Sequence, residues 1–565
     1  MAGRGNLNRY VLDCFVVKLL AMTPRTELIR RERLQAKMIR GFRQIALLTT
    51  LSRVLGMVRD MVFAYFLGAT GLMDGWAIAF KIPNLARRLF GEGAASSSLI
   101  PVYSEELQAN RENANKLAFT VVTVVFVLLV GIVLVGEGVI WGYYRFFSSY
   151  QGTQLKLTLS AIMLPYMVLV CVVAILAGIL NAHRHFACPA AAPIVLNVLI
   201  IGSLCLSGWV LQIEPRTQVF IVAGAVLLAG LVQIFIQLPP LWARGIYFRP
   251  TWQVRSEAFR KVIFLMGPMV LGLTVTQINT LADDFIALWL SGSDEKGEVF
   301  RWLGRQVEYP LWEGAVSHLF YSQRLYQFPL GVFGISLAIA IFPVMSSDAA
   351  KKDFGAFCAT ISRGLRCTIF VALPATAGLW LIREPLVSVI FERGEFTEWD
   401  TIITAGTLSF YALGLCGYFA QQVLARAFYS MQDSKTPARS ALIAVFVNIV
   451  LNLTLVWFLG TGGLAAATAA CSYLQVCILA GVLRRRFGSV VLDRLVQALV
   501  KTAAATLCMF ATAVIALWLS KSWADIFKLL LAVPSATVVY LLAAKFLRIE
   551  MLSLLMGRQR REGGA

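Results

Sequence analysis

Six basic residues interrupt three otherwise apolar stretches of this chain, and their placement predicts an anion-binding cavity. They are Arg53, Arg59, Lys81, Arg87, Arg88 and Arg324. A charge at the centre of a membrane-spanning helix costs about 2.5 to 3.5 kcal/mol on insertion scales. Six unpaired cations in lipid would therefore cost more than the net stability of a typical fold. We infer that they face water, a partner or a substrate.

Three acidic residues, Asp60, Asp74 and Glu92, share these stretches and leave a surplus of three positive charges. Such a surplus suits a polyanionic ligand, because the planar guanidinium fork matches phosphate oxygens. A plainer interpretation stays open, in which Arg87 and Arg88 mark a helix end and Asp60 and Glu92 neutralise two of the other cations.

A second group of polar residues predicts a cation site. Asp283 and Asp284 are adjacent in an apolar stretch, while Asn448 and Asn452 are four residues apart and hence on one helical face. With Thr468 they offer carboxylate, amide and hydroxyl oxygens, which suit Na⁺ or a proton. The alternative is that the amides only join helices and that the acids lie near the membrane surface.

The elements that position these residues must be membrane helices. Of 565 residues, 58% are hydrophobic and 15% charged, and the mean hydropathy is +0.72. This composition excludes a water-soluble globular or disordered protein. Ten scattered cysteines, three histidines and the lack of a GxxxxGK[ST] motif argue against a disulfide scaffold, a zinc or haem protein and an ATP-driven motor.

About fourteen stretches are long enough to cross a bilayer, which needs roughly 20 apolar residues per helix. We therefore predict an all-α polytopic membrane protein and set a transmembrane β-barrel aside. The predicted spans are 43–66, 71–103, 116–143, 157–181, 189–211, 217–242, 260–290, 315–346, 364–382, 400–425, 438–459, 461–483, 495–519 and 525–545.

The distribution of basic residues predicts the orientation. Most of the 51 Lys and Arg residues fall in segments on the same side as the N-terminus, which places both termini in the cytoplasm by the positive-inside rule. The excess of basic residues therefore does not indicate nucleic-acid binding. Residues 1–42 form a basic cytoplasmic extension unless Met38 is the true start, and 291–314 form an exposed loop on the opposite side.

Several ordered motifs resemble the MurJ (MviN-type) lipid II flippase family. Residues 51–60 read LSRVLGMVRD, residues 79–94 read AFKIPNLARRLFGEGA, and residues 428–437 read FYSMQDSKTP. Arg324 precedes the matching segment Phe328–Gly331. The resemblance extends from about residue 43 to 545.

This resemblance implies the multidrug, oligosaccharidyl-lipid and polysaccharide exporter fold, with two six-helix lobes in a V and two further C-terminal helices that form a groove for a lipid tail. The implied parts are an N-lobe at 43–242, a cytoplasmic linker at 243–259, a C-lobe at 260–483, the two groove helices at 484–546 and a cytoplasmic tail at 547–565.

The resemblance also implies roles for the charged residues. Arg53, Arg59, Arg87 and Arg324 would contact the diphosphate of the substrate. The residues that would act as cavity or gating partners are Ser52, Asp60, Asp74, Lys81, Arg88 and Glu92.

The implied function is movement of lipid II, the undecaprenyl-diphosphate-linked peptidoglycan precursor, from the inner to the outer leaflet by alternating access. We expect a monomer in the bacterial inner membrane without a cofactor, driven by Na⁺, H⁺ or the membrane potential, with peptidoglycan synthases as partners. The alternatives are a flippase for another polyprenyl-linked glycan, a cation-coupled drug antiporter, and a polyprenyl-phosphate glycosyltransferase with Asp283 and Asp284 at its centre.

Overall fold

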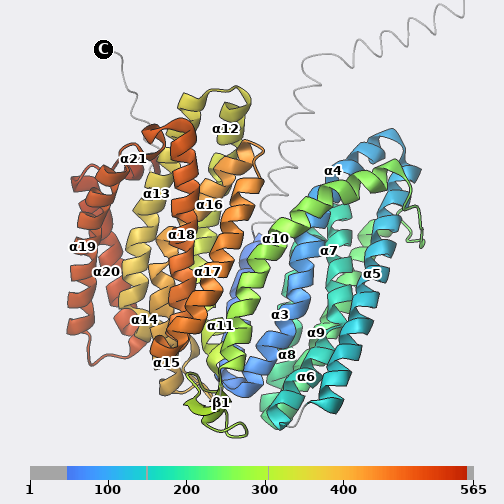
Figure 1. The fold of residues 1–565 in the computed structure, drawn as a ribbon, viewed down its shortest axis with the longest axis horizontal. Helices are drawn as coiled ribbons and strands as arrows, with labels where there is room; N and C mark the ends of the chain where they lie inside the picture. The colour runs from blue at the N-terminus through green and yellow to red at the C-terminus, as the bar shows by residue number, and fades with distance from the viewer. Residues whose placement is uncertain (1–46, 148–149, 303, 556–565) are drawn as a thin grey trace, which may run out of the picture.

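The computed structural model describes residues 47–147, 150–302 and 304–555, and these residues form two helical bundles (Figure 1). The predicted extension 1–42, Met38 and the end of the predicted tail lie outside them. The first bundle begins with a helix over residues 47–67. It continues with α3 (Gly71–Ala86), η1 (Arg87–Gly93), α4 (Ala94–Ala109), α5 (Arg111–Phe146), α6 (Gln151–Met163), α7 (Tyr166–Ala182), α8 (Ala187–Cys205), η2 (Leu206–Val210) and α9 (Pro215–Trp242).

The second bundle follows a short β-hairpin, β1 (Val299–Trp302) and β2 (Arg305–Glu308). Its elements are α11 (Ala315–Pro329), η3 (Leu330–Ile335), α12 (Ser336–Ala350), α13 (Phe354–Leu381), α14 (Arg383–Phe391), α15 (Glu398–Leu413), α16 (Leu415–Ser430), α17 (Lys435–Leu459) and α18 (Thr461–Phe487). After η4 (Ser489–Leu492), the helices α19 (Leu495–Leu519) and α20 (Asp525–Phe546) pack beside α13 and α14, and α21 (Glu550–Leu555) folds back onto α13.

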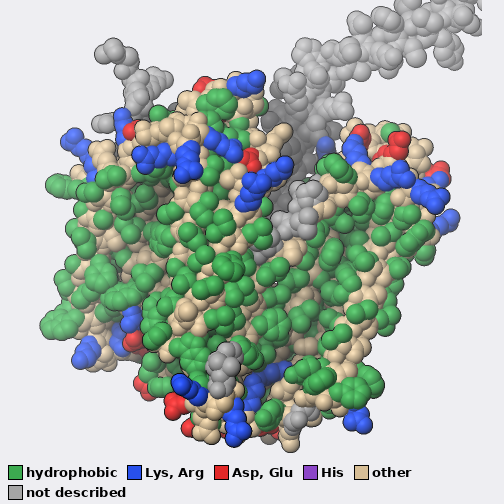
Figure 2. Space-filling model, viewed as in Figure 1, with side chains coloured by type: hydrophobic (Ala, Val, Ile, Leu, Met, Phe, Trp, Pro, Cys, Tyr) green, Lys and Arg blue, Asp and Glu red, His purple; other side chains and the backbone are tan. Residues whose placement is uncertain are grey.

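Each of the fourteen predicted spans coincides with a helical segment of the structure. Ten described helices are long and apolar enough to cross a membrane, and the bent pair α15 and α16 makes an eleventh. Large apolar side chains cover the outer surface between the two ends (Figure 2), including Leu134, Phe235 and Phe458, which are 66%, 65% and 82% exposed. Such exposure in water would be costly, so this surface belongs in lipid.

The segment 291–314, predicted as an exposed loop, is more ordered than expected. Val299 pairs with Glu308 and Trp302 with Arg305 in an antiparallel register. Ser291 and Leu311 are buried and joined by an isolated bridge. This hairpin marks one end of the molecule, called the hairpin end below, and Figure 1 shows it beneath both bundles.

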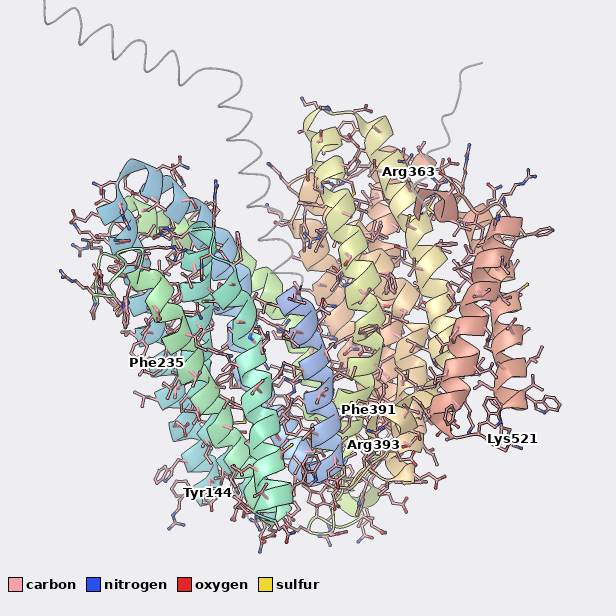
Figure 3. The ribbon with its side chains drawn as sticks, turned by 180° about the vertical axis from the view of Figure 1, so that it is seen from behind. Tyr144, Phe235, Arg363, Phe391, Arg393 and Lys521 are labelled. Atoms are coloured by element: carbon pink, nitrogen blue, oxygen red, sulfur yellow. The ribbon has the colours of Figure 1, made fainter. Side chains whose placement is uncertain are left out.

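The two bundles meet at the hairpin end and diverge toward the opposite end, called the open end (Figures 1 and 3). At the hairpin end the Glu395 backbone N–H donates to the Tyr65 carbonyl at 3.0 Å. Gly394 makes this approach possible, since a β-carbon there would lie 2.2 Å from the same carbonyl and its φ is +63°. At this point the seam, the surface along which the two bundles meet, is backbone against backbone, and position 394 has no room for a side chain.

The helix α10 (Glu257–Trp289) crosses between the bundles. It packs on α4 of the first bundle and on α17 of the second. Near its start, Lys261 pairs with Glu105 of α4 at 2.6 Å. Because α10 contacts both bundles, any change in the angle between the bundles must alter the contacts of α10.

At the open end, Asp433 fixes the loop between α16 and α17. It accepts hydrogen bonds from the Thr436 backbone N–H and hydroxyl, at 3.0 and 2.8 Å, and pairs with Arg486 of α18 at 2.7 Å. Partial burial raises the pKa of the Asp433 carboxyl, but these contacts outweigh it, so the pKa lies below its usual value of 3.8.

Replacement of this carboxylate is expected to cost stability only while it is charged. Because the folded-state pKa is depressed, the contribution is present above pH 3.8 and is lost as pH falls through the lower folded value. Asp433→Asn should lower unfolding free energy near pH 7 by about 0 to 1 kcal/mol, the range for partly exposed pairs. Thermal unfolding in detergent at pH 7 and in strong acid measures this. A difference that persists in acid would contradict it.

Candidate functional site

The carboxylate of Asp60 lies between two arginines from different bundles. Arg59 donates to Asp60 Oδ1 from Nε at 3.0 Å and from Nη2 at 2.7 Å. Arg324 of α11 places its Nε 3.2 Å from Asp60 Oδ2. Asp60 is 3% exposed, so both guanidinium groups meet their counter-charge in a region of low dielectric, where it attracts them strongly.

Further contacts hold each of these arginines in place. Arg59 Nη1 donates to Asn197 Oδ1 of α8 at 3.1 Å, and the Asn197 amide donates in turn to the Ser52 carbonyl at 3.2 Å. The Arg324 guanidinium stacks over the Phe320 ring with 4.5 Å to its centroid. Asn197 was not predicted from the sequence. An amide alone in an apolar helix is the signal that would have found it.

Between the bundles lies a cavity of about 170 Å³ that joins the two predicted groups of residues. Its wall includes Arg324, other predicted basic residues, and the two adjacent acids of α10. The other predicted site residues that line it are Lys81, Arg88, Asp283, Asp284 and Thr468. Amides and phenols complete the wall, among them Gln277, Gln323 and Tyr411.

Arg53, Arg59 and Arg87 do not line this cavity, whereas Arg88 does. Arg53 is exposed and lies close to Gly331 of η3. A β-carbon added at Gly331 would be 3.4 Å from Arg53 Nη1. Arg87 is half-buried, and its Nε donates to Asn84 Oδ1 at 3.0 Å. Arg88 is exposed and donates to Gln277 of α10 at 3.2 Å. The side chain of Glu92 falls outside the described residues.

Asp74 stands apart from the cationic set and closes the seam near the hairpin end. Its carboxylate accepts from the backbone N–H groups of Gly314 and Ser317, at 2.8 and 2.7 Å, and from the Ser317 hydroxyl at 2.6 Å. These donors begin α11, whose first backbone N–H groups have no partner within the helix. A residue of the first bundle thus caps a helix of the second.

The predicted cation site is assembled in the second bundle. Asp283 is 2% exposed and accepts from Asn452 Nδ2 at 2.6 Å and from Thr468 Oγ1 at 3.1 Å. The Asn448 amide contacts both of these donors. Within the described chain, the buried Asn452 Oδ1 accepts no hydrogen bond. An unused acceptor beside a buried carboxylate is a place where a cation or a proton can bind.

Asp284 differs from its neighbour because its partner is a lysine of the first bundle. It forms an ion pair with Lys81 of α3, whose ammonium also donates to the Thr280 carbonyl at 3.0 Å. Of the two acids of the predicted cation site, Asp283 therefore contacts α17 and α18, whereas Asp284 contacts α3.

Comparison with known proteins finds relatives of this chain among lipid II flippases. The family described as Lipid II flippase MurJ matches residues 63–537. The probable lipid II flippase MurJ of Vibrio cholerae is 36% identical over 77% of this chain and 81% of its own length. The lipid II flippase MurJ of Burkholderia cenocepacia is 30% identical over 78% and 82%.

Solved structures share the fold. A lipid II flippase MurJ in an inward closed conformation superposes with a TM-score of 0.71 at 24% identity, over 89% of this chain and 98% of its own. An inward-facing multidrug transporter of the MATE family superposes with a TM-score of 0.59 at 14% identity, over 78% and 94%.

Removal of the Asp74 carboxylate is expected to loosen the hairpin end. Asp74→Ala leaves buried N–H and O–H donors without their acceptor, which costs about 1 to 3 kcal/mol. A cysteine placed at buried Ala69 in a cysteine-free background should then react faster with maleimide. Asp294→Asn, a change at an exposed acid of the same end, is the control. Equal labelling rates in the Asp74 variant and its parent would show that the cap does not hold the seam.

Proposed function

This chain belongs to the MurJ family of lipid II flippases, and we propose that it moves the lipid II headgroup through the space between its bundles by binding the diphosphate at the Asp60 arginine cluster. It is a multi-pass membrane transporter and not an enzyme. The cluster is defined as Arg59, Asp60 and Arg324.

The observation that carries this proposal is the sharing of one carboxylate by two arginines from opposite bundles. A diphosphate presents several anionic oxygens and can replace Asp60 as the partner of both guanidinium groups. The arginines would then stay neutralised while the substrate passes. Arg324 lines the cavity already, and Lys81 and Arg88 add positive charge to the same wall.

Arg53 and Arg87 complete the proposed path as outlying contacts. Arg53 is exposed beside η3, and Arg87 lies one helical turn from Asn84, a residue of the cavity wall. A long guanidinium side chain at such a position can reach a phosphate that enters the gap.

We further propose that the open end faces the cytoplasm. Basic clusters such as Arg484, Arg485 and Arg486 end α18 there, as the positive-inside rule requires of a cytoplasmic face. The closed seam at the hairpin end would then face outward, and the structure would represent an inward-facing state. Rocking of the bundles about the α10 contacts would expose the headgroup on the other side.

We also propose that the cation site couples the movement of lipid II to the binding of Na⁺ or a proton. Asp283, Asn448, Asn452 and Thr468 provide oxygen ligands of the kind that Na⁺ takes, and a proton on Asp283 would serve the same purpose. The membrane potential is a second drive, since one charge moved through 100 mV is worth about 2.3 kcal/mol.

The arginine cluster is tested by rescue of a bacterium depleted of its own lipid II flippase. Arg59→Ala and Arg324→Ala are each expected to lower outer-leaflet exposure of lipid II by more than about tenfold, because an arginine–phosphate pair is a strong charge-assisted contact. Arg363→Ala, at an exposed arginine of α13 labelled in Figure 3, is the matched control. Transport by well-expressed cluster variants at the control's rate would refute the proposed site.

The cation site is tested with a reconstituted protein in vesicles of defined ionic content. Asp283→Ala and Asn452→Ala are expected to abolish the dependence of lipid II transport on Na⁺ or on pH. Thr454→Ala, an exposed position on the same helix as Asn452, should keep it. If both site variants retain transport with its ionic dependence, this assignment is wrong.

A further inference from the structure

Two adjacent carboxylates of α10 face opposite bundles. Asp283 is held by Asn452 and Thr468 of the second bundle, whereas Asp284 is paired with Lys81 of the first. Successive residues of a helix point about 100° apart, so a single turn of α10 presents one acid to each bundle. Both carboxylates line the same cavity, so a cation that enters the cavity can reach either of them.

The Lys81–Asp284 pair lies in the half of the molecule where the bundles meet. Lys81 is seven residues beyond Asp74 on α3, which is about 10 Å along the helix from the seam. Asp284 is five residues before the end of α10 at the hairpin end. Because Asn452 and Thr468 hold this turn of α10 against the second bundle, opening of the hairpin end would draw the Lys81 ammonium away from the Asp284 carboxylate.

Separation of this pair would leave a buried charge without compensation. Asp283 and Asp284 are 2% and 5% exposed. With Lys81 in place, the group of two carboxylates and one ammonium carries one net negative charge if both acids are ionised. Without Lys81 it carries two. A second uncompensated charge in so buried a place is strongly unfavourable.

We propose that Lys81 is a tethered cation, which compensates the charge of Asp284 while the hairpin end is closed and is replaced there by a free monovalent cation when that end opens. The inference rests on the alternating-access function proposed above. It assigns Lys81 to ion coupling as a positioning residue, in addition to its place in the cavity wall.

The exchange links ion binding to conformation. A free cation binds the open hairpin end more tightly than the closed one, because only the open end lacks the ammonium. By thermodynamic reciprocity, the same cation must favour opening by an equal factor. Lys81 favours closure, so the protein returns to the closed hairpin end whenever the free cation leaves.

The test measures the conformational response to Na⁺ in the full-length protein in nanodiscs. Spin labels at exposed Gln151 of the first bundle and Trp399 of the second, in a background without native cysteines, report the distance across the hairpin end. Replacement of choline by sodium should shift the wild-type ratio of open to closed populations by about tenfold, a usual size for coupling between sites.

Lys81→Met is expected to remove this response. The closed state then lacks its tethered cation and needs a free one as much as the open state does, so Na⁺ no longer favours opening. Lys521→Met, at an exposed lysine of the hairpin end (Figure 3), should behave as wild type. Asp284→Asn is a second variant, with a reduced response expected because its closed state no longer needs Lys81.

A wild-type sodium response in folded Lys81→Met or Asp284→Asn protein would overturn the inference and leave Lys81 as a strut between bundles. A pH series in choline separates the two cations: a proton-coupled protein shifts with pH and ignores sodium. The distances require no substrate, so the inference can fail while lipid II is still transported. Likewise, a transport failure of the wild type would leave the ion response standing.

Discussion

The shared carboxylate of Asp60 is the constraint on which the interior depends. Charges this far from water persist only when each is compensated at contact distance. Asp60 is adjacent to Arg59 in sequence but meets Arg324 only through the approach of α11 to the helix over 47–67. The bundles therefore meet around an ion pair as well as around apolar packing.

The requirement that each buried polar group has a partner also holds along the seam. Asp284 compensates Lys81, and Asp74 accepts three hydrogen bonds from the start of α11. In each case a polar group of α3 finds its partner across the gap between bundles. Closure of the hairpin end thus satisfies groups that opening must expose, and a substrate or a cation can take over that role.

Apolar packing within each bundle gives these polar contacts a rigid support. Trp76 of α3 is fully buried and stacks with Phe80, and Tyr326 of α11 stacks with Tyr411 of α15. Rings packed at such density resist small deformations. Motion is therefore expected as rotation of whole bundles, with changes confined to the seam and to α10.

The sequence by itself determined the membrane class and the fourteen helical segments, and it named the residues of both candidate sites. Those features follow from local information, namely apolar run length, the cost of charge in lipid, and motif order. The clustering of Asp283, Asn448, Asn452 and Thr468 also followed from residue type, because buried polar groups need hydrogen-bond partners.

Only the tertiary structure decided which partner each charge takes. Sequence spacing could not separate Asp284, paired across the bundles, from Asp283, held within one, since neighbouring residues on a helix diverge by rotation alone. Nor could it place Asn197 beside Arg59, 138 residues away, or turn the loop at 291–314 into a hairpin. Such pairings depend on how helices cross in space, and no local pattern encodes that crossing.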